Sequence, residues 1–219
     1  MTNALLDNDV LLKAARYRLI TPLLANVPLG IAVYHILGSA AHIVRKKLKK
    51  NPPACGLDEA LAEFDRAAAA LATVEPTREE IEFAARLELR AQRLNLPLDQ
   101  GESILCAILA LRGYDYLLTG DKRAIGAIEA LLPHEPTLNA AGKLVCLEQL
   151  FLWYVSGVGV EEARSVVCAE KAADRTLSIC FACNSAATTL EACCAGLKSY
   201  IAALRATAPT VLLSSPTGS

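Results

Sequence analysis

The alternation of short apolar runs with longer amphipathic stretches constrains the fold of this chain more than any other feature. Apolar runs of strand length occur at residues 4–6, 30–37, 114–118 and 143–147. The run at 30–37 has the β-branched and aromatic content of a buried strand, although periodicity alone does not separate it from the start of a helix. Strands that alternate with helices are joined by crossovers, which produce a parallel sheet covered on both faces. The sequence therefore predicts an α/β fold.

Apolar residues at helical spacing predict helices at 10–17, 57–71, 77–94, 99–111, 122–132 and 148–155. Thr77 and Glu80 have the spacing of a capping box, and Asp99 is the expected N-cap of the next helix. Beyond residue 157 the strand signals stop, and helices are predicted at 160–169, 174–182 and 185–206. We therefore expect an α/β domain at 1–156, a helical extension packed on it at 157–206, and a tail at 207–219 that is disordered after Leu213.

Composition excludes several classes of protein. Hydrophobic residues make up 53% of the chain and aromatic residues only 5%, so the core must come mainly from aliphatic helix faces, which excludes a β-sandwich and a disordered chain. The formal net charge of −1 gives no global field for holding nucleic acid, so any such contact must come from a local patch.

The longest segment without Asp, Glu, Lys or Arg runs from Leu19 to Val44. Pro22, Pro28 and Gly30 interrupt it, so a buried strand and helix are favoured over a membrane span. No export signal opens the chain, and Asp7 follows too soon for one. We therefore expect a cytoplasmic protein that does not enter a membrane and whose eight cysteines are reduced.

Acidic residues fall where predicted strands end. Asp7 and Asp9 follow the first strand and Asp121 follows the third, and parallel strands deliver such residues to one edge of the sheet. Asp99 and Glu102 share the first turn of one helix. If these turns converge, the carboxylates surround one pocket with no obvious internal cation, and Mg²⁺ or Mn²⁺ would neutralise them. Each acid taken alone is more often a helix cap than a ligand, and only the occurrence of the whole set at strand exits favours a site.

Three segments in order resemble motifs of the PIN-domain nucleases: L-L-D-N-D-V-L-L at 5–12, L-D-Q-G-E-S-I-L-C-A-I-L-A at 98–110 and Y-L-L-T-G-D-K-R-A-I at 116–125. The resemblance spans about residues 3–150. It implies a PIN-like three-layer fold and a Mg²⁺- or Mn²⁺-dependent ribonuclease that hydrolyses single-stranded RNA. Asp7, Glu102 and Asp121 match the catalytic metal ligands, Asp99 is an alternate ligand, and Asp9 holds a supporting position. Many such small proteins are toxins of toxin–antitoxin pairs, which implies an antitoxin protein as a partner.

One departure from the family pattern affects the expected activity. The family usually has another acid in the second helical region, whereas residues 25–51 contain no Asp or Glu. Either Asp58 or Glu59 substitutes for it, or the site has lost a ligand. The alternative function is therefore a catalytically degenerate PIN-like scaffold, whose helical extension packs against a partner or a second copy in a homodimer.

Basic residues near the acids are candidates for RNA contact. Lys122 and Arg123 follow Asp121 directly, and the run R-K-K-L-K-K at 45–50 supplies Arg45, Lys46 and Lys47. A solvated helix end is the competing explanation for the run.

Cysteines in the extension suggest a zinc site through Cys180-x-x-Cys183 and the pair Cys193-Cys194. Adjacent cysteines suit a tetrahedral site poorly, and the flanks are those of apolar helix faces. Buried free thiols are therefore favoured.

Overall fold

The computed structural model describes residues 1–214. Within them, five strands form one parallel sheet in the order β3-β2-β1-β4-β5. The strands are β1 Thr2–Leu6, β2 Ala32–Leu37, β3 Ala72–Val74, β4 Tyr116–Thr119 and β5 Leu144–Cys146. The predicted α/β class is thus confirmed at the level of an all-parallel sheet flanked by helices. Sequence analysis missed β3, which is only three residues long.

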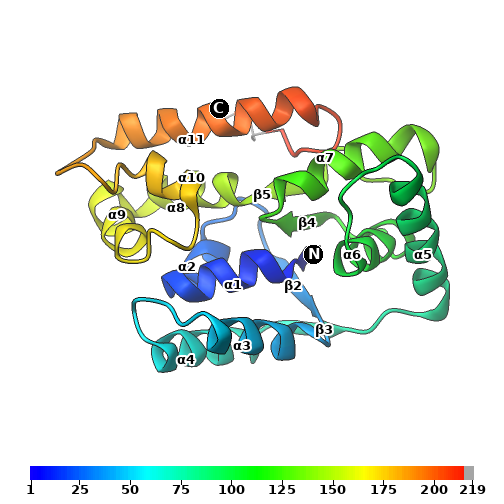
Figure 1. Cartoon of the computed structure of the whole chain (residues 1–219), viewed down its shortest axis with the longest axis horizontal. Helices are drawn as coiled ribbons and strands as arrows, with labels where there is room; N and C mark the ends of the chain where they lie inside the picture. Colours follow the sequence, from blue (N-terminus) through cyan, green and yellow to red (C-terminus); the bar gives the residue numbers. More distant parts are fainter. Residues whose placement is uncertain (215–219) are drawn as a thin grey trace.

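Helices connect the strands and continue beyond the last one (Figure 1). They are α1 Asn8–Tyr17, α2 Ile20–Ala25, α3 Ala40–Lys50, α4 Leu57–Ala68, α5 Arg78–Arg93, α6 Gln100–Leu111, α7 Lys122–Leu131, the 3₁₀ turn η1 Leu132–His134, α8 Leu147–Val158, α9 Val160–Ala169, α10 Arg175–Cys180 and α11 Leu190–Thr207. The last of these begins five residues later than the predicted start at 185.

Alternate residues of the strands feed two hydrophobic layers, one on each face of the sheet. In β1, Ala4 and Leu6 join one layer and Leu5 joins the other, as the period of two in a strand requires. Helices α1 to α4 and α8 to α10 cover the first face, and α5 to α7 cover the second. Helix α11 contributes to both layers, through Leu197 on one side and Leu204 on the other.

Local capping signals are confirmed. Thr77 accepts a hydrogen bond from the Glu80 amide at 3.3 Å, and the Glu80 carboxylate accepts one from the Thr77 amide at 2.7 Å. Asp99 and Glu102 form the same reciprocal pair, at 2.9 and 2.8 Å. Such boxes satisfy backbone amides that have no partner within the helix, so they fix where α5 and α6 begin.

The charge-free segment 19–44 divides into α2, β2 and the start of α3. Pro22 lies in the first turn of α2, where its missing N–H would have no helical partner, so it does not break that helix as its sequence suggested. Among residues 1–214, no helix combines the length and the apolar composition needed to cross a bilayer.

The start of the predicted tail is packed against the sheet. Ala208, Val211 and Leu212 are buried, and the Leu144 amide donates to the Val211 carbonyl at 2.9 Å. Leu213 in turn donates to the Leu144 carbonyl at 2.7 Å, so this segment pairs with β5 through a single parallel bridge. Residues 208–213 are thus packed on the sheet, and disorder is expected only after Leu213. For 215–219 the expectation lies outside the described residues.

Candidate functional site

The order of the sheet creates a crevice at the carboxyl ends of β1 and β4. The chain runs outward from β1 through β2 to β3, then returns to the other side of β1 with β4. Helix α1, which follows β1, lies on one face, and α7, which follows β4, lies on the other. Ligands of open α/β sheets bind at such a reversal of strand order. Asp7 and Asp121 are each within two residues of the end of one of these strands.

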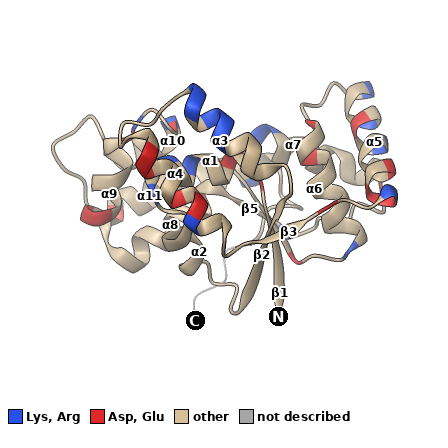
Figure 2. Cartoon of the chain, turned by 90° about the horizontal axis from the view of Figure 1, so that it is seen from below, with Lys and Arg blue, Asp and Glu red and all other residues tan. Residues whose placement is uncertain are grey.

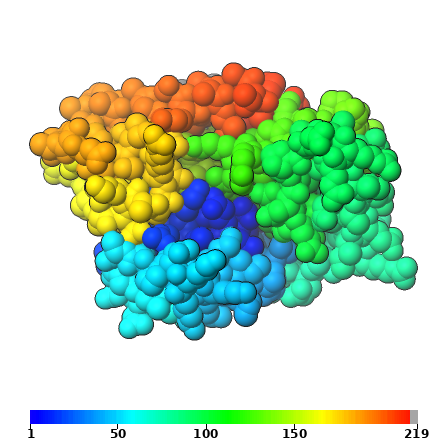
Figure 3. Space-filling model, in the orientation of Figure 1, coloured from blue at the N-terminus to red at the C-terminus, as the bar shows by residue number. Residues whose placement is uncertain are grey.

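A cavity of about 460 Å³ opens at this crevice. Its lining comes from the starts of α1, α6 and α7 and from one face of α3: Asp7, Asn8, Asp9, Ile43, Lys47, Asp99, Gly101, Glu102, Asp121 and Arg123. In the space-filling view, α1 (blue) lies at the floor of a hollow bordered by α3, by the green α6 and by the yellow residues of the extension (Figure 3). All five acids expected to share a pocket do line this cavity.

Asp7 is buried at the floor of the acidic cavity, with 6% of its surface exposed. It occupies the N-cap position of α1, yet its side chain makes no capping hydrogen bond. Its carboxylate instead accepts a hydrogen bond from the Thr119 hydroxyl at 3.1 Å. Burial raises the pKa of Asp7 to about 6, and the nearby charge of Asp9 adds to the increase. Helix capping therefore does not explain this residue.

Glu102 has a local role and an unusual environment at the same time. One carboxylate oxygen closes the capping box by accepting from the Asp99 amide at 2.8 Å. Only 9% of the residue is exposed, and this burial raises the pKa of Glu102 to about 7. The negative charges of Asp99, Asp121 and Asp7 raise it further. Burial and the neighbouring acids thus both favour the protonated form of the Glu102 carboxyl.

Asp121 has the opposite electrostatic character. Its carboxylate caps α7 by accepting from the amides of Arg123 at 2.8 Å and Ala124 at 3.4 Å, and it pairs with the Arg123 guanidinium at 2.8 Å. Burial alone would raise the pKa of Asp121, but the hydrogen bonds from Arg123 and the two amides outweigh it and lower the pKa. Capping and ion pairing therefore account for its local geometry.

Lys13 overturns the expectation that the acids have no internal cation. Its ammonium lies 2.7 Å from Asp9 and 3.0 Å from Asp174, which belongs to the C-terminal extension. Burial alone would lower the pKa of Lys13, but the charges of the two acids outweigh it and raise the pKa. The spacing of Asp9 and Lys13, four residues apart on one helix, is a signal that sequence analysis could have used. Asp174 gave no such signal.

Helix α3 places Ile43 and Lys47 at the cavity, on the segment where the resemblance called for another acid. Asp58 and Glu59 lie in the first turn of α4, and neither lines the cavity. The suggestion that one of them substitutes for the missing acid is therefore wrong.

Basic residues predicted to contact RNA are divided between the cavity and other partners. Lys47 and Arg123 line it, and Lys46 is exposed one residue away on α3, whose basic end stands out in Figure 2. Arg45 pairs with Asp65 at 2.8 Å. Lys122 does not line the cavity, because its ammonium contacts the buried Glu148 at 2.5 Å and the Thr176 hydroxyl at 2.8 Å.

The donor set of the cavity fits a hard divalent cation in its chemistry, since it consists of carboxylate oxygens. Asp7 and Glu102 each accept one hydrogen bond through a single oxygen, which leaves the other oxygen of each for a cation. Across residues 1–214, however, no three His, Cys, Asp or Glu side chains are gathered tightly enough to hold a metal as they stand. Of the three candidate ligands, Asp121 is the one already paired with a cation, the Arg123 guanidinium.

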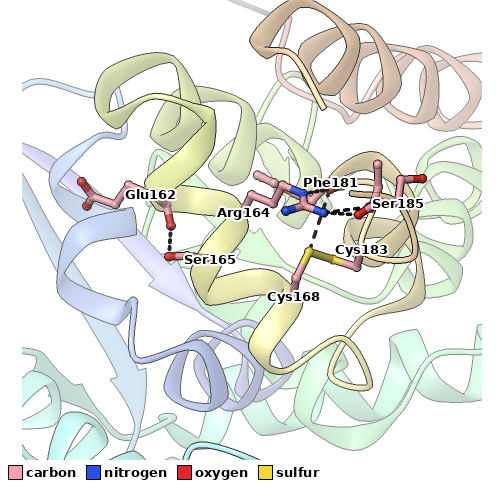
Figure 4. The surroundings of a disulfide bond; sticks show 8 residues. Glu162, Arg164, Ser165, Cys168, Phe181, Cys183 and Ser185 are labelled. Carbon is pink, nitrogen blue, oxygen red and sulfur yellow. Dashed lines mark hydrogen bonds between the residues drawn. A yellow bond between two sulfur atoms is a disulfide. The ribbon is translucent and has the colours of Figure 1, made fainter. Parts of the chain in front are cut away.

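The expectation that all eight cysteines are reduced is wrong for Cys168 and Cys183, which form a disulfide with each other (Figure 4). The end of α9 and the turn after α10 bring their Cα atoms to 5.0 Å. Cys180 and Cys193 are buried free thiols, as favoured from the sequence, and Cys194 is half-buried and free. Disulfides are rare in cytosolic proteins, so this bond does not support the expected cytoplasmic location, which stays a prediction.

Comparison of the chain with models of protein families, with curated proteins and with solved structures found no match in any of the three. The PIN-like resemblance therefore remains an expectation based on the three motifs.

Proposed function

We propose that the protein is a Mg²⁺- or Mn²⁺-dependent ribonuclease with a PIN-like fold, which hydrolyses phosphodiester bonds of single-stranded RNA at the acidic cavity. The observation that supports it most is the pair Asp7 and Glu102. Both carboxyls are buried and line one cavity, and their pKa values are raised to about 6 and about 7, so their ionised forms destabilise the fold unless a bound cation neutralises them.

Asp7, Glu102 and Asp121 are the residues that would hold the cation, with Asp99 as an alternate and Asp9 in support. When bound, the cation would activate a water for attack on the phosphodiester and stabilise the attacking and leaving oxygens. Arg123 leaves Asp121 at little cost, because its side chain is 77% exposed and exposed ion pairs are weak. Once released, its guanidinium can pair with a phosphate of the substrate.

Lys47 on α3 and Arg123 on α7 both line the cavity, so an RNA backbone passing over the acids meets cations from two different helices. Lys46 extends this positive border. The chain as a whole carries a formal net charge of −1, so no overall positive field adds to this local border. We therefore expect binding of a short single-stranded segment, with a marked dependence on salt.

The direct test is incubation of the full chain with a fluorescent single-stranded RNA in Mn²⁺, with and without EDTA. Cleavage should require Mn²⁺ and should be lost in Asp7→Asn and Glu102→Gln. Asp65→Asn is the matched control, because Asp65 is a half-exposed acid paired with Arg45 outside the cavity. Cleavage that persists in EDTA, or that Asp7→Asn leaves intact, would refute the proposal.

A degenerate scaffold is the second candidate, and Ile43 and Lys47 favour it, because the helix that should supply a further acid supplies an apolar and a basic side chain. A scaffold would show no Mn²⁺-dependent cleavage and would bind a partner or a second copy through the helical extension. The toxin role, the antitoxin and the cytoplasmic location are predictions that need cellular tests, such as growth arrest on expression of wild type but not of Asp7→Asn.

A further inference from the structure

Lys13 links the C-terminal extension to Asp9, one of the acids that line the cavity. Lys13 lies on α1, one turn after Asp9, and its side chain is only 17% exposed. The same ammonium contacts Asp9 at 2.7 Å and Asp174 at 3.0 Å. Asp174 is itself 11% exposed, so this bridge is well shielded from water and from salt. Substitution of Asp174 therefore alters the environment of Asp9 through the Lys13 ammonium that both acids contact.

Asp9 has little freedom to move away from Lys13. A methyl group added at Gly120 would lie 2.3 Å from one carboxylate oxygen of Asp9, so the acid is held between the Lys13 ammonium and the turn between β4 and α7. Asp121 is the next residue of that turn and lines the same cavity. The Asp9 carboxylate thus lies between two neighbours. One is the backbone of Gly120, next to Asp121, and the other is the Lys13 ammonium, which also contacts Asp174.

Asp174 is held in place by three features of the extension. It caps α10 by accepting from the Leu177 amide at 3.0 Å. The disulfide between Cys168 and Cys183 closes the segment that contains it. Figure 4 shows Arg164 donating to the carbonyls around the second cysteine, at 3.1 Å to Phe181 and 2.5 Å to Ser185. The disulfide and these hydrogen bonds restrict the motion of the segment, so they also restrict the position of Asp174 relative to Lys13.

We propose that Asp174 is a positioning residue of the acidic site, which acts through Lys13 to fix Asp9 and to offset the positive charge of Lys13 at the cavity. The proposal rests on the proposed function for its consequence, which is the binding of a divalent cation. With Asp174 in place, the ammonium is shared between two carboxylates and the cavity keeps most of its negative potential. Without that acid, the ammonium pairs with Asp9 alone and repels a cation in the cavity.

Asp174→Asn isolates the charge, because asparagine caps a helix about as well as aspartate. It should weaken Mn²⁺ binding to the full chain on the order of three- to tenfold, as measured by calorimetric titration of the protein with Mn²⁺ alone. Glu170→Gln is the matched control. Glu170 lies on the same disulfide-closed segment and is buried, but it pairs with Arg16 one turn further along α1, away from the cavity. This variant should lose stability and keep the affinity for Mn²⁺.

A second measurement separates failure of this proposal from failure of the proposed function, because it needs no metal. In a double-mutant cycle of Asp9→Asn and Asp174→Asn, denaturant unfolding in EDTA should show the double variant less stable than the sum of the single effects. Loss of both acids leaves Lys13 buried and without either acidic partner. We therefore expect the unfolding equilibrium constant of the double variant to exceed the value predicted from the two single variants by about threefold or more. A wild type that binds no Mn²⁺ but shows this coupling would refute the function alone. Additive effects, or Asp174→Asn binding Mn²⁺ as tightly as wild type, would overturn the role of Asp174.

Discussion

The turn after β1 and the turn after β4 have the same sequence pattern, an apolar strand followed by aspartate and a helix, yet their acids have opposite properties. Asp7 is buried, does not cap α1 and has a raised pKa. Asp121 is half-buried, caps α7, pairs with Arg123 and has a lowered pKa. The strand–acid–helix pattern thus places a carboxylate at the edge of the sheet. Whether that carboxylate stabilises the fold is decided by side chains from other segments.

Among the substitutions in these two turns, replacement of Asp7 should change the free energy of unfolding the most. Because the pKa of Asp7 in the folded state is raised from 3.8 to about 6, the folded state binds more protons than the unfolded state between these values, and this acid makes stability fall as pH rises through that window. Asp7→Asn should therefore stabilise the metal-free protein by about 1–3 kcal/mol at pH 8 and by almost nothing at pH 4. Urea unfolding at both pH values measures the difference. A gain at pH 4 as large as at pH 8 would show that ionisation of Asp7 is not the cause.

Asp121 should respond in the opposite direction and by less. Asp121→Ala removes the cap of α7 and should cost about 0.5–2 kcal/mol, whereas Asp121→Asn keeps the cap and should change stability by less than about 0.5 kcal/mol. Thermal unfolding of the two variants in EDTA measures both effects. If Asp121→Asn is stabilised as strongly as Asp7→Asn, the two acids share one environment and the comparison between the turns fails.

Arg123 should have the smallest effect on stability, since its side chain is 77% exposed. Arg123→Ala should change the free energy of unfolding by less than about 0.5 kcal/mol. It should tighten Mn²⁺ binding several-fold, because Asp121 no longer has a competing cation, and it should weaken binding of single-stranded RNA. Arg78→Ala is a suitable control, because Arg78 forms a similarly exposed ion pair with Glu82 at 2.8 Å and does not line the cavity. Weaker Mn²⁺ binding in Arg123→Ala would contradict the competition.

Features of the fold that depend on neighbouring residues could be predicted from the sequence. The capping boxes at Thr77 and Asp99 lie within four residues, and the apolar runs that become β1 and β4 are continuous. The acids of the cavity could be predicted too, because parallel strands deliver their carboxyl ends to one edge. That rule accounts for Asp7 and Asp121, which follow β1 and β4, whereas Glu102 lies in the first turn of α6, a helix that is preceded by α5 rather than by a strand.

Features that depend on distant residues could not be predicted. The ion pair of Lys13 with Asp174 and the disulfide of Cys168 with Cys183 form only when the chain folds. The same holds for the hydrogen bonds between residues 208–213 and β5. A three-residue strand such as β3 is too short for its period to be recognised. The opposite pKa shifts of Asp7 and Asp121 could not be predicted either. Burial raises the pKa of Asp7 despite the hydrogen bond from Thr119, whereas Arg123 and the helix amides lower the pKa of Asp121.

The measurement that tests the central claim most directly is thermal unfolding of wild type and Asp7→Asn over a titration of Mn²⁺, with EDTA as the reference. A cation that binds only the folded state raises the midpoint of unfolding as its concentration increases. At one hundred times the dissociation constant, the added free energy of unfolding is about 2.7 kcal/mol. Wild type should show this rise, and Asp7→Asn, more stable than wild type in EDTA, should show none. A wild type without a Mn²⁺-dependent rise, or an Asp7→Asn variant with the full rise, would contradict the assignment of the cavity as a divalent-cation site.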